Sequence, residues 1–238
     1  MKRQLLKFCS FLMVTLVCVA FTGDEKKQYG ELFQKIKSHM NPAGDHYVAC
    51  HYAFFKDSLA TKATHTLQVK RWKAGDKEVT QTELMHVLKE GDKQLIVDKE
   101  SNIIAFGPFN PQGGFSSGYE LYLDSLMASS RVLLTRNTGS TSTLLVRYPW
   151  SMPISASTLT FDHNNYQPKK ARLYTRVPQL IAEDEWAVQP RIDIEYQRME
   201  QGAVKLPESI DKYLKETEEG YQLQEAYRAY EFINQFND

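Results

Sequence analysis

The sequence predicts an α+β protein, in which a strongly curved, mostly antiparallel sheet forms an unclosed β-barrel covered by two helices. Three observations support this class. Apolar and polar residues alternate along most of the chain, which is typical of strands with one buried face. Two segments instead repeat apolar residues every three or four positions, as helices do. Short turn signals separate the strands, which favours antiparallel pairing, and a one-sided sheet needs the helices as its cover.

The composition is that of an ordinary globular protein. The chain has 238 residues, of which 42% are hydrophobic and 24% charged, and its 29 Lys and Arg side chains balance 29 Asp and Glu side chains. These values exclude a collagen-like, coiled-coil or wholly disordered chain. The balanced charge also gives no electrostatic reason to expect a nucleic-acid partner.

The N-terminal segment has the features of an export signal. A basic start precedes an uncharged, mostly apolar run over residues 8–21. This run is shorter than the ~20 residues that a helix needs to span a bilayer, and small residues suit cleavage after Ala20. We therefore expect residues 1–20 to be a cleaved signal peptide, with a cut after Thr22 as the alternative. Residues 21–238 are then expected to form one exported domain with no stable membrane span.

The first element of the mature chain is predicted to be an amphipathic helix. Its apolar residues recur at spacings of three and four, and Pro42 and Gly44 end the pattern. The polar face mixes Glu31 with basic residues, so packing against a sheet is favoured over binding to a membrane surface. The apolar residues of this helix are Tyr29, Leu32, Phe33, Ile36 and Met40.

A series of strands follows, because the apolar period changes to two. Regular alternation is clearest in the first two strands, and shorter apolar segments continue the series at 79–88, 95–97 and 103–106. Turn dipeptides at Gly75-Asp76 and Gly91-Asp92 separate these runs, so a meander is the simplest topology. The alternating residues of the first two strands are Val48, Cys50, Tyr52, Phe54, Leu67 and Val69.

A loop and a second helix interrupt the strands. Residues 107–118 contain two Pro, adjacent Gly residues and several Ser, which predicts a loop. Residues 119–127 repeat apolar side chains at helical spacing, which predicts a short helix that ends near Ser129. This helix and the first one are the expected cover of the sheet.

Alternation returns in the C-terminal half of the chain. Strands are expected around residues 144–148, 159–161 and 192–196, with a hairpin turn at Asn164-Asn165. Each of these strands is apolar on one side only. They therefore extend the same one-sided sheet.

The C-terminal tail has two interpretations. Its aromatic residues suit either a helix over 223–236 or a pair of short strands that turn at Glu219-Gly220. We favour the pair of strands.

Sequence motifs for catalysis are weak. The stretch Gly114 to Gly118 matches the G-x-S-x-G elbow of serine hydrolases, but Ser116 follows a Pro- and Gly-rich stretch rather than a strand. A Gly/Ser-rich connector is the favoured interpretation, with a hydrolase built on Ser116 as a further hypothesis. The histidines lack metal-ligand spacing, and the acidic run at 183–185 is typical of a solvated turn. We therefore expect no enzyme activity, no metal and no cofactor.

One cysteine, Cys50, remains once the signal peptide is removed. A single thiol excludes an internal disulfide. Its apolar neighbours predict a buried, unreactive side chain rather than a nucleophile.

The apolar inner face of the sheet is the better guide to function. A curved sheet closed by helices can leave a groove that suits a lipid or acyl chain, and a filled core is the alternative. The expected groove lining is Tyr52, Phe54, Leu67, Val69, Met85, Leu144, Val146 and Phe161.

Several segments carry a family resemblance in addition to the export signal and the first helix. They are residues 52–55, 66–69, 82–85, 94–100, 158–162, 166–170 and 227–230. With them the chain resembles the periplasmic lipoprotein-carrier (LolA-like) superfamily, and most closely an exported branch of it. The resemblance spans most of the mature chain.

This resemblance implies a curved, unclosed β-barrel covered by helices, found in carriers that shield lipoprotein acyl chains and in relatives that bind lipids. Such carriers hold the lipid with an Arg near the start of the sheet. Here Lys56 and Lys62 occupy the early strand ends, and the first Arg of the mature chain is Arg71. No functional residue is therefore carried over from the family.

The sequence thus predicts a periplasmic, non-enzymatic protein that holds a lipid or lipoprotein acyl chain in a groove between sheet and helices. Other cell-envelope proteins are further candidate partners. The alternative is a structural or accessory component of a cell-envelope assembly, in which the same sheet is a scaffold without a ligand cavity.

Overall fold

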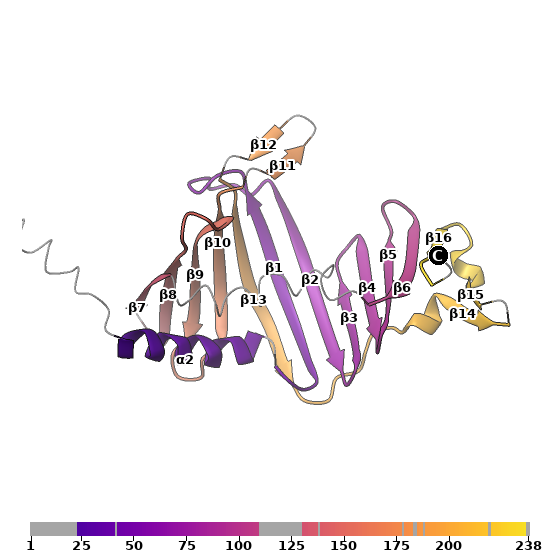
Figure 1. Cartoon of the computed structure of the whole chain (residues 1–238), viewed down its shortest axis with the longest axis horizontal. Helices are drawn as coiled ribbons and strands as arrows, with labels where there is room; N and C mark the ends of the chain where they lie inside the picture. Colours follow the sequence, from indigo (N-terminus) through magenta and orange to yellow (C-terminus); the bar gives the residue numbers. More distant parts are fainter. Residues whose placement is uncertain are drawn as a thin grey trace, which may run out of the picture.

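The computed structural model consists of one large sheet, a helix that lies across part of it, and a C-terminal tail (Figure 1). The predicted signal peptide, the Ser116 motif and the predicted helix at 119–127 lie outside the residues that the structure describes. No helix of the described part is long and apolar enough to cross a membrane. The described residues are 23–40, 42–109, 130–137, 139–177, 179–182, 185–187, 189–218 and 220–236.

Helix α2 (Gly23–Met40) confirms the first predicted helix. Phe33 and Ile36 are buried, whereas Glu31 is exposed, so the helix is amphipathic as its spacing indicates. The helix stops shortly before Pro42, because a proline disfavours helical backbone at the residue before it. Lys37 and His39 in its last turn are favourably placed at the negative end of the helix dipole.

The strands are short to medium in length, and several are joined by tight turns. Gly75 and Gly91 have a left-handed backbone, with φ of +60° at both, which fits the turns predicted there. Two short 3₁₀ helices, η1 (Ile210–Lys212) and η2 (Glu225–Tyr227), lie in the tail. The strands are β1 (His46–Phe55), β2 (His65–Ala74), β3 (Lys77–Gln81), β4 (Met85–Glu90), β5 (Lys93–Asp98), β6 (Ile103–Pro108), β7 (Arg131–Arg136), β8 (Thr141–Arg147), β9 (Ile154–Asp162), β10 (Pro168–Thr175), β11 (Gln179–Ala182), β12 (Glu185–Ala187), β13 (Arg191–Gln201), β14 (Leu214–Thr217), β15 (Gly220–Leu223) and β16 (Glu231–Asn234).

Twelve of these strands form one sheet, in the order β16-β6-β5-β4-β3-β2-β1-β13-β10-β9-β8-β7. Neighbours are antiparallel except for β16, which runs parallel to β6. Two meanders, β1 to β6 and β7 to β10, meet where β13 pairs with both β1 and β10. The predicted meander is present in β1 to β6, whereas the junction of the two halves through β13 was not part of the prediction.

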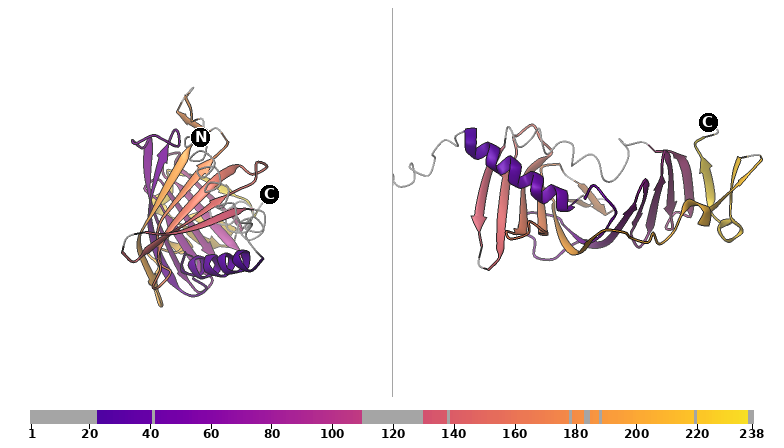
Figure 2. Two further views of the ribbon diagram at one scale, coloured as in Figure 1. Left: turned by 90° about the vertical axis from the view of Figure 1, so that its left-hand side faces the viewer. Right: turned by 90° about the horizontal axis from the view of Figure 1, so that it is seen from below.

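The register assigns each side chain to one of two faces, since residues directly opposite each other across a ladder point the same way. The inner face is defined by the consecutive partners Leu144, Leu159, Ala171, Ile194, Tyr52 and Leu67. The outer face is defined by the consecutive partners Trp72, Val79, Leu88, Leu95 and Phe106. Figure 2 shows the sheet curved, with α2 on its concave side and the C-terminal tail on its convex side.

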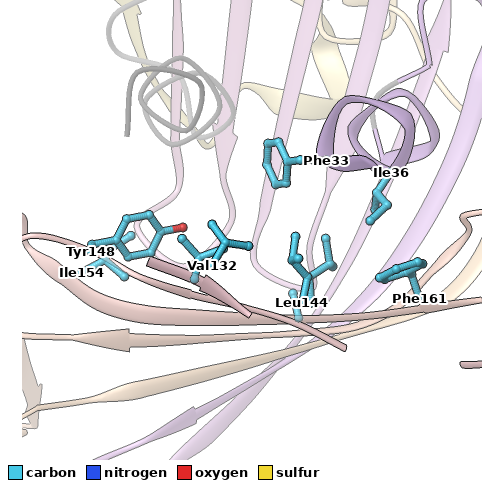
Figure 3. Close-up of a cluster of buried hydrophobic side chains, with 10 residues drawn as sticks. Phe33, Ile36, Val132, Leu144, Tyr148, Ile154 and Phe161 are labelled. Atoms are coloured by element: carbon cyan, nitrogen blue, oxygen red, sulfur yellow. The ribbon is translucent and has the colours of Figure 1, made fainter. Parts of the chain in front are cut away.

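Helix α2 covers the inner face of β7 to β10. Phe33 and Ile36 point from the helix toward Val132, Leu144 and Phe161 on the strands (Figure 3). Ile36 and Leu144 are completely buried, and Phe161 is only 1% exposed. This α2 cluster is a filled core of the kind that a one-sided sheet requires. Its buried members are Phe33, Ile36, Val132, Leu144, Val146, Tyr148, Ile154, Leu159, Phe161 and Ala171.

The C-terminal tail, residues 206–236, covers the outer face of β3 to β6. Tyr213 is 2% exposed and packs with strand residues such as Leu88 and Phe106. Strands β14 and β15 form the predicted hairpin, in which Thr217 pairs with Gly220. The buried members of this tail cluster are Val79, Leu88, Leu95, Val97, Ile104, Phe106, Ile210, Tyr213 and Leu214.

The fold-class prediction is therefore wrong in its cover. The mostly antiparallel sheet is present, but it is a large open sheet rather than a barrel under two helices. One helix, α2, occurs among the described residues, and the second covering layer is a tail of short strands and turns on the opposite face. The physical reason is that β3 to β6 carry apolar side chains on their outer face, and among the described residues the tail buries them.

Candidate functional site

All eight residues of the predicted groove lining lie on the inner face. The ladders place Tyr52 beside Leu67, and Cys50 beside Val69. Leu144 and Val146 alternate along β8, and Phe161 is opposite Ser142 of the same strand. Met85 points to the same side of β4 as Val87. The β3–β4 and β2–β3 ladders place this side on the inner face.

Three of the eight residues belong to the α2 cluster. Leu144 is fully buried, Val146 is 3% exposed and Phe161 is 1% exposed. They pack with Phe33 and Ile36 of the helix. In this structure they are core residues beneath α2.

The other five are partly exposed and lie beyond the α2 cluster. Tyr52, Phe54, Leu67 and Val69 sit together on the adjacent strands β1 and β2, whereas Met85 lies two strands away on β4. The structure thus brings four of the predicted residues together and leaves the fifth apart.

Strand β13 and its neighbour β10 add apolar residues to these four. Ile192 lies directly opposite Phe54, and Leu173 lies directly opposite Ile192. The sequence indicates β13 as a strand, but its position beside β1 depends on a long-range pairing that alternation does not specify. We call the six half-buried side chains together the central strip: Tyr52, Phe54, Leu67, Val69, Leu173 and Ile192.

One end of the central strip is aromatic. The rings of Tyr52 and Phe54 stack with centroids 6.4 Å apart, and Phe54 stacks on His65 of β2 at 4.1 Å. Thr64 closes this end, because its backbone N–H and its hydroxyl both donate to the Phe54 carbonyl, at 2.7 Å and 2.9 Å. This end leads directly into the loop of residues 56–64.

The other end of the strip is basic. Arg71 and Lys73 follow Val69 on the inner face of β2, and Lys73 lies opposite Glu78. Arg71 donates from Nη2 to the carbonyl of Met40 at 3.2 Å, so it ties the last residue of α2 to the sheet. The apolar strip is thus bounded by guanidinium and ammonium groups at this end and by aromatic rings at the other.

The inner face also holds the buried thiol of Cys50. It is 6% exposed, and burial raises the pKa of this thiol to about 11. A thiol with so high a pKa stays protonated near neutral pH and is a poor nucleophile. The predicted burial of Cys50 is confirmed.

No cluster of three or more potential metal ligands occurs within the part of the chain that the structure describes. The acidic residues 183 and 184 and the Ser116 motif are outside that part. The inner face near the central strip therefore offers apolar contact and cationic groups as its chemistry.

Comparison with known proteins gives structural likeness alone. No protein-family model matches the chain, and no curated protein matches its sequence. Among solved structures, it is similar to a LolA superfamily protein from Nitrosomonas europaea, with a TM-score of 0.32 and 9% identity over 74% of this chain and 94% of that one.

Two other solved structures have higher TM-scores with this chain. An uncharacterized conserved protein from Thermus thermophilus has a TM-score of 0.45 and 10% identity, over 87% of this chain and 99% of that one. The lipoprotein LppX from Mycobacterium tuberculosis has a TM-score of 0.40 and 9% identity, over 73% of this chain and 97% of that one.

Proposed function

We propose that this protein binds a lipid or a lipoprotein acyl chain along the central strip, in the periplasm, without catalysing a reaction. The observation that carries the proposal is a difference in side-chain burial along the inner face. Beside the strip, α2 buries the apolar side chains of β7 to β10, whereas the side chains of the strip itself stay half exposed.

An acyl chain matches the strip in shape and in chemistry. Burying hydrocarbon is favourable by roughly 0.8 kcal/mol for each CH₂ group. The row of side chains from Val69 to Phe54 follows the strand direction, which suits an extended chain. Arg71 and Lys73 at the basic end supply charges that favour an anionic or strongly polar headgroup.

The test is binding of a fluorescent fatty acid to the purified protein, together with native mass spectrometry of the protein as isolated. We expect a copurifying or exchangeable lipid. Leu67→Glu, which places a carboxylate within the strip, is expected to weaken probe binding by at least about tenfold, because the buried charge would lose its hydration.

Thr66→Glu is the matched control, since Thr66 is the exposed neighbour of Leu67 and points to the outer face. It introduces the same charge one residue away and is expected to leave binding unchanged. Absence of both copurifying lipid and probe binding in the wild-type protein would exclude the proposal and favour a scaffold role. Equal loss in the two variants would place the ligand elsewhere.

A further inference from the structure

Apolar side chains are unusually exposed at one end of the sheet. Leu59 and Trp150 are each 87% exposed, and Val177 is 50% exposed. They lie in residues 56–64 between β1 and β2, in residues 148–153 between β8 and β9, and just after β10. These three segments, which we call the loop end, are at the end of the sheet from which the β11–β12 hairpin rises (Figure 1).

A buried arginine holds the loop that carries Leu59. Arg191 is 7% exposed and donates from Nη1 to the Ser58 carbonyl at 2.7 Å and from Nη2 to the Ala60 carbonyl at 3.0 Å. The Asp57 carboxylate accepts from the backbone N–H groups of Leu59 and Ala60, at 2.8 Å and 2.7 Å. The backbone is therefore fixed on both sides of Leu59 while its side chain points to solvent.

A second arginine holds the loop that carries Trp150. Arg176 donates from Nη1 to the carbonyls of Pro149 at 2.9 Å and Met152 at 2.8 Å, and from Nη2 to that of Tyr148 at 3.1 Å. Its guanidinium also lies 4.8 Å from the centre of the Trp150 ring. Trp150, like Leu59, is thus presented by a loop whose shape is fixed by hydrogen bonds.

The two braced loops are parts of one surface. The backbone N–H of Arg176 donates to the Pro153 carbonyl at 2.6 Å, and that of Thr175 donates to the Pro190 carbonyl at 3.0 Å. Pro190 immediately precedes Arg191, whose side chain holds the loop that carries Leu59. These backbone hydrogen bonds, together with the Arg191 side chain, therefore connect the segments that carry Leu59, Trp150 and Val177.

The loop end continues the central strip. Phe54 is the last strip residue along β1, and loop 56–64 begins two residues later. The aromatic end of the strip is therefore next to the loop that carries Leu59. Lys56 and Lys62 flank Leu59 and are exposed.

We propose that the loop end docks on the surface of a lipid bilayer, with Leu59 and Trp150 entering the boundary between headgroups and acyl chains. This inference rests on the proposed function, because the bilayer would be the source or destination of the acyl chain. Tryptophan is favoured at that boundary, since its ring is apolar while its N–H stays hydrated. Lys56 and Lys62 are placed to meet lipid phosphates beside the inserted leucine.

The test is flotation of the full mature chain with phosphatidylcholine vesicles, with and without phosphatidylglycerol. We expect the wild-type protein to float with the vesicles, and more strongly when phosphatidylglycerol is present. Leu59→Ser and Trp150→Ser are each expected to reduce vesicle binding on the order of tenfold, because each removes a large apolar side chain from the boundary. Trp150 emission, taken as the difference between wild type and Trp150→Phe, is expected to shift to shorter wavelength on vesicle addition.

Leu133→Ser is the matched control, since Leu133 is 53% exposed but lies on the outer face of β7, outside the three segments of the loop end. It should bind vesicles as the wild type does. If the wild-type protein does not bind vesicles but still binds the fatty-acid probe, the docking inference is overturned and the proposed function stands. If it binds neither vesicles nor the probe, both the docking inference and the proposed function are excluded. Vesicle binding that survives Leu59→Ser with Trp150→Ser, in a protein with an unchanged melting curve, would also overturn the inference, as would binding of this surface to a protein partner instead.

Discussion

Glu208 fastens the C-terminal tail to the outer side of the sheet. One carboxylate oxygen accepts from Gln81 Nε2 at 2.7 Å and from His86 Nδ1 at 2.6 Å. The other accepts from the Tyr213 hydroxyl and from Lys212 Nζ, both at 2.7 Å. Burial alone would raise the pKa of Glu208, but hydrogen bonds from Lys212, Tyr213 and Gln81 outweigh it and lower that pKa. The carboxylate is therefore ionised in the folded protein.

Replacing Glu208 should loosen this attachment. Glu208→Ala is expected to reduce the free energy of unfolding by about 3 kcal/mol, because it leaves the Tyr213 hydroxyl and His86 without their buried acceptor. Urea denaturation measures the change. Glu225→Ala is the control, since Glu225 pairs with Arg228 at the surface, and its loss should cost less than about 0.5 kcal/mol. Similar losses in the two variants would contradict the role given to Glu208.

His86 makes the same attachment sensitive to pH. Its pKa is lowered, first by burial and then by Lys99 and Lys212, against the opposing effect of Glu208. The unfolded chain then binds a proton more readily than the folded one, so stability falls as the pH drops below the ordinary histidine pKa of 6.5. Urea denaturation across this range should show a shallower pH dependence in His86→Gln than in the wild type. An unchanged slope would show that His86 does not contribute.

Strands with one solvated face were the elements that the sequence predicted best. In Val48 to Phe54, Leu144 to Tyr148 and Ile192 to Tyr196, every second side chain is apolar and lies on the inner face. The pairing that joins these strands into one sheet could not be predicted from the sequence, since β13 pairs with β1 from a distant part of the chain. The predicted groove lining therefore includes the four central-strip residues on β1 and β2 but not Ile192 and Leu173.

Strands with apolar side chains on both faces explain the main error. In β5, Leu95 and Val97 belong to the outer tail cluster, whereas Ile96 points to the inner face. The continuous apolar run of residues 95–97 was the available signal, since a strand with apolar residues on both faces loses its alternation. The cover itself was harder to predict, because the tail buries tyrosines through short strands and 3₁₀ turns that lack a helical period.

Helix α2 should contribute to stability through a narrow set of contacts. Ile36 is completely buried against β7 to β10, so Ile36→Ala is expected to lower the free energy of unfolding by about 3 kcal/mol through lost burial and the resulting cavity. Glu31→Ala, on the exposed face of the same helix, should change it by less than about 0.5 kcal/mol. Urea denaturation compares the two. A small effect at Ile36 would mean that α2 does not pack on the sheet as described.

The molecule as a whole has two hydrophobic cores on opposite faces of one sheet, and the two cores lie over different strands. The α2 cluster lies on the inner face of β7 to β10, and the tail cluster lies on the outer face of β3 to β6. Strands β1, β2 and β13 join these two halves. This offset leaves Tyr52, Phe54, Leu67, Val69 and Ile192 of the joining strands outside both clusters, which is where the central strip lies.

Because the two cores share no buried residue, substitutions in them should act independently. Val146 in the α2 cluster is 3% exposed and Val97 in the tail cluster is 1% exposed, so each Val→Ala change is expected to cost about 2 kcal/mol. The double variant should lose the sum to within about 0.5 kcal/mol in urea denaturation. Val146→Ala with Val132→Ala is the comparison, since these residues are opposite each other in one cluster and should couple through a shared cavity. Strong coupling between Val146 and Val97 would instead mean that the sheet transmits packing changes from one face to the other.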